Sequence, residues 1–310
     1  MTCEYTIHQN HSFIQQNQPR PARDQSRRHT MTSAPATIRL LDSATEVSAQ
    51  DAGGVVVTGS HGGTYAAYLV AQCGVRAAVF NDAGVGCEHA GIRGLDYLQS
   101  IGVPAVAVAH VSARIGRATD TLQRGIVSHV NRCATALGCR PGQTCADATR
   151  CLSNATPCLV RGPQLRESRI LLLSGAIPVW GLDSASLVLP TDAGSVIVAG
   201  SHGGLVGGRK DKALQVDGAA AIFHDAGVGL EEAGIGRLPA LDERGIAAAT
   251  VAAESARIGD ARSMWSTGVI SHINGCAADL GGRTGLGVRE FAERLRTALT
   301  TRQEATMEKT

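Results

Sequence analysis

The chain has 310 residues, of which 44% are hydrophobic, 18% charged and 3% aromatic, and its formal net charge is +2. This balance excludes a wholly disordered chain and a coiled coil, and no apolar run approaches the roughly 18 residues that a membrane-spanning helix needs. Since no signal peptide is recognisable either, we expect a cytoplasmic protein with no membrane partner.

Residues 1–34 are predicted to be a disordered tail, rich in Gln, Arg, His and Pro. Four arginines against Glu4 and Asp24 within residues 1–30 account for the whole net charge, so the rest of the chain is neutral. A neutral body with few aromatic side chains lacks the basic surface and the stacking platforms of a nucleic-acid-binding protein. We therefore expect a small-molecule ligand and no nucleic acid, and a homo-oligomer is left open.

Nine cysteines, an odd number, occur without a CxxC pair. This favours reduced thiols over a disulfide framework. Five of them fall within residues 133–158, at spacings that match no zinc-ligand pattern. We interpret Cys133 and Cys145 as small core residues, since both lie on the apolar faces of predicted helices.

One unit of sequence occurs twice in the chain. The repeated segments are VVVTGSHGG (55–63) and VIVAGSHGG (196–204), VFNDAGVG (79–86) and IFHDAGVG (222–229), SARIG (112–116 and 255–259), and GIVSHVNRCA (125–134) and GVISHINGCA (268–277). The offset is 141 residues at the first pair and 143 at the others, so the second copy has two extra residues after its first motif. Two long copies do not form a solenoid, and a duplicated domain with an approximate two-fold axis is expected instead.

The predicted organisation follows from this repeat. A first unit covers residues 35–155 and a second unit covers residues 179–300. Residues 156–178, which contain Pro and Gly, form the connector, and residues 301–310 form a C-terminal tail.

Each unit is predicted to contain strands that alternate with helices. In the first unit the expected elements are strands at 54–58, 75–80 and 103–109, and helices at 64–73, 120–137 and from 145 onward. Continuous apolar runs separated by helix-length segments indicate parallel strands that are covered on both faces. The predicted fold class is therefore α/β, with internally duplicated three-layer α/β/α units, mostly parallel sheets and a pseudo-two-fold relation.

The repeated polar loops each follow a predicted strand. In an open parallel sheet, ligands bind outside the carboxyl ends of the strands, so chemistry is expected there. The GSHGG loop suits an anion or an oxyanion, because its glycines leave backbone N–H groups free for a ligand. In this interpretation a serine is a nucleophile or hydroxyl donor, a histidine is a base, and an aspartate orients the histidine. The catalytic candidates are Ser60, His61, Asp82, Ser201, His202 and Asp225.

These candidates also have structural interpretations. Ser60 could cap the following helix, His61 could pack between the units, and Asp82 could organise its own loop. The sequence contains no HExxH motif and no spaced Cys/His cluster. No cofactor is therefore predicted, and a divalent metal held by His and Asp stays open.

Arg114 and Arg257 lie in an apolar context after a strand, where a guanidinium could clamp a substrate carboxylate. The alternative is an internal ion pair with Asp82 or Asp225. Ser128 and Asn131 are three residues apart and are expected to share a helix face. The substrate-binding candidates are Gly62, Gly63, Asn81, Ser112, Arg114, Ser128, Asn131, Gly203, Gly204, His224, Ser255, Arg257, Ser271 and Asn274.

The sequence therefore predicts a hydrolase that acts on a small carboxylate-bearing or cyclic amide or ester substrate. One alternative is an isomerase or lyase that moves protons with His and Asp residues from both units. A further alternative is a small-molecule-binding protein without enzymatic activity.

Overall fold

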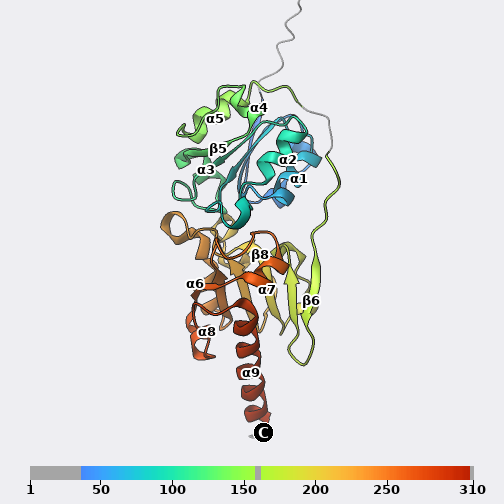
Figure 1. Cartoon of the computed structure of the whole chain (residues 1–310), viewed down its shortest axis with the longest axis vertical. Helices are drawn as coiled ribbons and strands as arrows, with labels where there is room; N and C mark the ends of the chain where they lie inside the picture. The colour runs from blue at the N-terminus through green and yellow to red at the C-terminus, as the bar shows by residue number, and fades with distance from the viewer. Residues whose placement is uncertain (1–35, 158–161, 308–310) are drawn as a thin grey trace, which may run out of the picture. The chain divides into compact units, whose positions relative to one another are not determined.

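The structure is a computed structural model that describes residues 36–157 and 162–307. The predicted disordered tail, residues 1–34, lies outside the described residues. Two mixed, mostly parallel sheets with helices on both faces confirm the predicted α/β class (Figure 1). None of the helices in residues 36–157 and 162–307 could span a membrane.

The first unit contains a five-stranded sheet in the order β1-β2-β3-β4-β5. Neighbouring strands from β1 to β4 are parallel, and β5 is antiparallel to β4. Its valine- and alanine-rich central strands are buried except at His61, the last residue of β2, as expected of strands covered on both faces. The strands are β1 (Ile38–Leu41), β2 (Val55–His61), β3 (Ala77–Asn81), β4 (Ala105–Val108) and β5 (Val127–Val130).

Helices cover both faces of this sheet. One face packs against α1 and α2 and the other against α3 and α5, so alternate valines of β2 enter different cores. Figure 1 shows α1 and α2 together on one side of the strands. The helices are α1 (Thr64–Gln72), α2 (Gly94–Ser100), α3 (Ala118–Arg124), α4 (Arg132–Thr135) and α5 (Cys145–Leu152), with 3-10 turns η1 (Ala44–Glu46), η2 (Ala49–Asp51) and η3 (Cys87–His89).

The second unit contains a six-stranded sheet in the order β11-β10-β9-β8-β7-β6. Strands β7 to β10 are parallel, and both edge strands are antiparallel to their neighbours. The strands are β6 (Arg169–Leu173), β7 (Val179–Leu182), β8 (Val196–His202), β9 (Ala220–His224), β10 (Ala247–Val251) and β11 (Ile270–Ile273). The helices are α6 (Arg237–Asp242), α7 (Ala261–Thr267), α8 (Gly275–Asp279) and α9 (Val288–Met307), with 3-10 turns η4 (Ala185–Leu187), η5 (Pro190–Asp192), η6 (Val206–Gly208), η7 (Lys210–Lys212) and η8 (Leu230–Ile235).

Several predicted segments differ from the structure. The expected helix at 120–137 is instead α3, β5 and α4, so Ser128 lies on a strand and Asn131 caps α4, and the two share no helix face. Gly125 ends α3, and the β-branched residues after it pair with β4, so tertiary pairing overrides the helical spacing. Part of the predicted connector forms β6, and α9 continues through the predicted C-terminal tail to Met307. Cys145 is buried as expected, whereas Cys133 is only partly buried.

The two units differ in the segment after the GSHGG motif. In the first unit this segment is helix α1, whereas in the second unit the turns η6 and η7 replace it. Gly207 and Gly208 there have φ of +63° and +67°, which is incompatible with an α-helix. The two extra residues of the second unit therefore fall in a segment that has lost its helix.

The DAGVG loops of the two units meet backbone to backbone. The two units together, residues 35–310, form a single compact body. A Cβ on Gly84 would lie 2.9 Å from the Cα of Gly227, and the reverse distance is also 2.9 Å. Each loop also donates one hydrogen bond to the other unit: Cys87 N to Ala253 O and Leu230 N to His110 O, both at 2.8 Å. These reciprocal contacts are those expected of two copies that face each other across an approximate two-fold axis.

Replacing Gly84 with alanine should destabilise the protein more than the same change at Gly53. Both glycines are left-handed, with φ of +73° and +70°, so each variant carries a conformational cost of about 1–2 kcal/mol. Only Gly84 lacks space for the methyl group, since nothing lies within 4 Å of a Cβ on Gly53. We expect Gly84→Ala to lose about 1–3 kcal/mol more from overpacking, measured as the free energy of unfolding in urea. Equal losses in the two variants would contradict this close contact.

Candidate functional site

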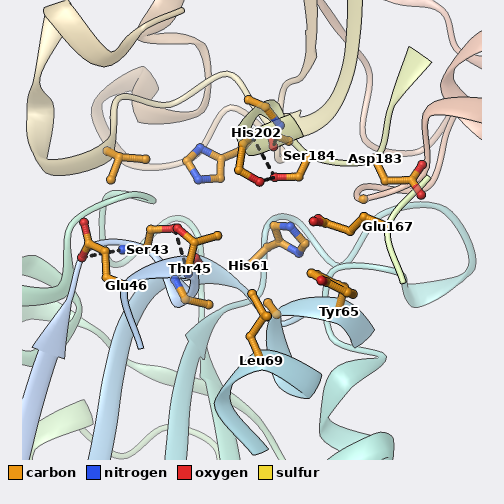
Figure 2. A pocket seen from close by; sticks show the side chains of 18 of the residues that line it. Ser43, Thr45, Glu46, His61, Tyr65, Leu69, Glu167, Asp183, Ser184 and His202 are labelled. Atoms are coloured by element: carbon orange, nitrogen blue, oxygen red, sulfur yellow. Dashed lines mark hydrogen bonds between the residues drawn. The ribbon is translucent and has the colours of Figure 1, made fainter. Parts of the chain in front are cut away.

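A cavity of about 480 Å³ lies where the two GSHGG motifs approach each other (Figure 2). The motifs end strands β2 and β8, so their Ser and His side chains lie at the carboxyl ends of the strands, as expected. Both units and the segment before β6 contribute to the lining. Its polar residues are Ser43, Thr45, Glu46, Ser60, His61, Tyr65, Glu167, Asp183, Ser184, Ser186, Ser201, His202, Lys212, Gln215 and Arg237.

The two cavity histidines have the same hydrogen-bond pattern. Nδ1 of His61 accepts a bond of 3.1 Å from Gly63 N, and Nδ1 of His202 accepts one of 3.2 Å from Gly204 N. A Cβ on Gly63 would lie 2.6 Å from that same Nδ1, which explains the glycine at this position. Because Nδ1 is an acceptor, the proton of the neutral ring is on Nε2. The histidines therefore present an N–H donor and have no free basic nitrogen.

Burial determines the charge of these histidines. Desolvation, together with the nearby His224, lowers the pKa of His61 to about 4. Desolvation also lowers the pKa of His202 well below its usual value, and the charges of Arg237 and His61 act in the same direction. Both rings are therefore neutral at pH 7 but only weakly basic, and Nδ1 of each already accepts a backbone N–H. This argues against the general-base role expected from the sequence.

A carboxyl group in the cavity titrates near neutrality. Burial, with the negative charge of Asp183, raises the pKa of Glu167 to about 7, although a hydrogen bond with Ser184 opposes this. Figure 2 shows the Glu167 side chain entering the cavity on the side of His61 and above Tyr65. Sequence reasoning missed Glu167 because it lies in the predicted connector and has no counterpart in the repeat.

The cavity serines bond to the main chain. Ser60 Oγ accepts a bond of 2.8 Å from Ala44 N, and Ser201 Oγ accepts one of 2.8 Å from Ala185 N. Ser60 does not cap α1, because the N-cap is Gly63. Within the described part of the chain, no hydrogen bond joins either serine to His61 or His202. The expected nucleophile–base pair is therefore not assembled in this structure.

Asp82 and Asp225 do not line the cavity. Asp82 Oδ1 accepts bonds from Gly84 N (3.1 Å) and from the backbone N and ring Nδ1 of His110 (2.8 Å each). Burial acts to raise the pKa of Asp82, but the bonds from His110 and Ser128 outweigh it and lower the pKa. Asp225 Oδ1 accepts from Gly227 N at 2.9 Å. These contacts support the loop-organising interpretation, and His110 was missed because its repeat counterpart is Ala253.

His224 and Asn81 occupy equivalent positions and make equivalent bonds. Asn81 accepts from Ala83 N and donates to Ala113 O, while His224 accepts from Ala226 N and bonds to Ala256 O. Since Nδ1 of His224 is the acceptor, its Nε2 must carry the proton. The chemical difference between the units at this position therefore preserves one structural role.

Arg114 and Arg257 each form one ion pair within their own unit and one with the other unit. Arg114 bonds Asp120 at 2.9 Å and Glu231 at 3.3 Å, and Arg257 bonds Asp260 at 2.8 Å and Glu88 at 2.9 Å. The internal pairs with Asp82 or Asp225 that we considered are not formed. The carboxylates already neutralise both guanidinium groups, and neither arginine lines the cavity.

The other polar candidates from the sequence hold loops in place and do not line the cavity. Asn131 accepts from Ala105 N and Ala134 N and donates to Leu95 O and Val103 O, and Asn274 makes the equivalent bonds. Ser112 and Ser255 likewise bond only main-chain groups, while Ser128 and Ser271 contact the neighbouring His129 and His272. Gly62 and Gly203 leave no room for a Cβ, because carbonyl oxygens would lie within 2.9 Å of it.

A metal site would need several ligating side chains in one place. Across residues 36–157 and 162–307, no group of three or more His, Cys, Asp or Glu is arranged to hold a metal ion.

Comparison of the chain with models of known protein families, with curated protein sequences and with solved structures gave no match.

The desolvated histidines of the cavity should make stability depend on pH. The pKa of His61 is about 4 in the folded protein, against about 6.5 in an unfolded chain, so the unfolded state binds more protons between these values. The contribution of these histidines to stability is therefore complete above about pH 6.5 and is lost as the pH falls toward 4. For each histidine, the folding equilibrium constant falls by up to about tenfold per pH unit.

Urea titrations from pH 7 to pH 4 measure this slope, and His61→Gln should reduce it. The ¹⁵N signals of the His61 ring should show the Nε2–H form throughout pH 5–8. A ring that gains a proton near pH 6.5 would show that the cavity histidines are not desolvated.

Proposed function

We propose that the cavity is the active site of an enzyme that moves a proton on a small carbonyl-containing molecule, as an isomerase or lyase. The observation that carries the proposal is the presence, in one cavity, of a carboxyl group with a pKa near 7 and two neutral imidazole N–H donors. Glu167 supplies the carboxyl group, and His61 and His202 supply the donors.

The chemistry follows from these protonation states. A base whose pKa lies near the working pH is both available and strong enough to take a proton adjacent to a carbonyl group. The developing negative charge falls on the carbonyl oxygen, where an N–H donor stabilises it. A neutral imidazole beside a glutamate base is an established arrangement for this task in other enzymes. Glu167 would therefore remove and return the proton, while His61 or His202 holds the oxygen.

This proposal corresponds to the first alternative from the sequence, in which residues of both units move protons. The histidines come from the two repeats as expected. The carboxylate is Glu167, because Asp82 and Asp225 are engaged in their own loops.

Hydrolysis of an amide or ester is the second candidate, and the presence of Ser60 and Ser201 in the cavity lining favours it. Each Oγ accepts one main-chain bond, which leaves the hydroxyl proton free to be donated. Here Glu167 would activate a serine or a water molecule, and the histidines would bind the oxyanion.

Incubation of the protein with a panel of small carbonyl compounds in D₂O tests the proposal. We expect ¹H NMR to show loss of the proton adjacent to the carbonyl in at least one compound, with a rate that rises with pH through about 7 as Glu167 ionises. Glu167→Gln should reduce the rate by at least about 100-fold, since it removes the base. Glu243→Gln is the matched control, because Glu243 pairs with Lys210 at the surface, and it should retain the activity.

The outcomes separate the candidate functions. Deuterium in unconverted compound that is absent with Glu167→Gln supports proton transfer. Cleavage products without exchange support the hydrolase, and binding without either reaction supports a non-enzymatic binding protein. Exchange at an unchanged rate in Glu167→Gln would remove Glu167 from the mechanism.

A further inference from the structure

Arg237 is a buried cation in the wall of the cavity. It begins α6 and is only 5% exposed. Its Nε donates to Gly204 O at 3.1 Å, its Nη1 donates to Ala213 O, and its guanidinium carbon lies 4.7 Å from the centre of the Phe223 ring. These partners orient the group but carry no formal negative charge. Among the described residues, no acidic side chain pairs with Arg237.

The repeat shows that this cation belongs to the second unit alone. The equivalent residue of the first unit is Gly94, where a Cβ would lie 2.6 Å from both the Ala67 Cβ and the Gly63 oxygen. Helix α1 therefore leaves no room for a side chain at that position. In the second unit the turns η6 and η7 replace the helix, and the guanidinium occupies the space and binds Gly204 O, the counterpart of Gly63 O.

One nitrogen of the guanidinium is left for a ligand. Within the described chain, every buried side-chain nitrogen or oxygen has a hydrogen-bond partner. Nε and Nη1 have their partners in the main chain, whereas no bond is made by Nη2. Nη2 must therefore be accessible, and because the rest of the residue is buried at the cavity wall, that access is from the cavity. Burial lowers the pKa of Arg237 only to about 10, so the group stays charged at neutral pH.

We propose that Arg237 binds a carboxylate group of the small molecule that occupies the cavity. A desolvated guanidinium without a counter-ion is costly, and a carboxylate that reaches Nη2 forms a charge-assisted hydrogen bond and neutralises it. A carboxylate bears a single charge, which suits a cavity that also contains the acidic groups Glu167 and Asp183. The identification of that molecule as the substrate rests on the function proposed above.

The proposed anion-binding residue is therefore Arg237 and not Arg114 or Arg257, which the sequence indicated. Arg114 and Arg257, the candidates from the repeat, are each neutralised by one carboxylate of their own unit and one of the other unit. Arg237 lacks such a partner and lies near His202, whose pKa its charge helps to lower. A carboxylate bound at Nη2 would therefore lie near the Nε2–H donors of the cavity.

Titration of the full chain with acetate, at constant ionic strength in chloride, tests the proposal without any turnover. We expect saturable movement of the ¹⁵N–¹H signal of Arg237 Nε and of the His202 ring signals. Arg237→Gln should weaken acetate binding by about tenfold or more, because it removes a charge-assisted bond. Arg244→Gln is the matched control: Arg244 also donates to main-chain carbonyls, at Leu214 and Val216, but does not line the cavity, and its variant should bind acetate like the unmodified chain.

The signals of the unmodified chain decide the matter even if Arg237→Gln fails to fold. Two results would overturn the proposal: the absence of a saturable shift at Arg237 Nε and His202, or unaltered acetate binding by a folded Arg237→Gln variant. The role of Arg237 would then be to pack in the space that α1 occupies in the first unit. A negative result here leaves the deuterium-exchange experiment intact. Conversely, acetate binding without any exchange would retain the anion site and remove the proposed reaction.

Discussion

The close backbone contact between Gly84 and Gly227 holds the DAGVG loops of the two units against each other. It requires left-handed conformations in both DAGVG loops, including the β-branched Val85 and Val228, which adopt them at a conformational cost. The reciprocal bonds and ion pairs around it join the strand ends of the two sheets. Because the GSHGG motifs end the neighbouring strands, this contact also brings His61 and His202 to one cavity.

Desolvation explains the electrostatic character of that cavity. It keeps the two histidines neutral and holds the carboxyl group of Glu167 near its titration point. Burial also lowers the pKa of Arg237, but only to about 10, because the normal pKa of a guanidinium is far above neutrality. Arg237 therefore stays charged. One environment thus produces uncharged donors, a titrating acid and a cation, which are the groups that proton transfer on an anionic carbonyl compound would require.

The repeat itself separates structural roles from the proposed chemical ones. Asn131 with Asn274, and Asn81 with His224, make matching bonds in the two units, so their recurrence reflects the fold. Glu167 and Arg237 distinguish one side of the cavity, since Glu167 has no counterpart in the first unit and the counterpart of Arg237 is Gly94. The residues that recur in both units therefore indicate structural roles, and they do not point to Glu167 or Arg237.

The sequence was enough to predict the α/β class, the repeat and the strand-end positions of Ser60, His61 and their equivalents, because apolar periodicity and glycine motifs are local properties. It did not determine that residues 120–137 contain a strand, since pairing with β4 overrides helical spacing. The ion pair of Arg114 with Glu231 and the position of Glu167 in the cavity are seen in the folded chain and could not be predicted from the sequence. Charge pairing and desolvation depend on groups brought together from distant parts of the chain, and no local pattern specifies which groups those are.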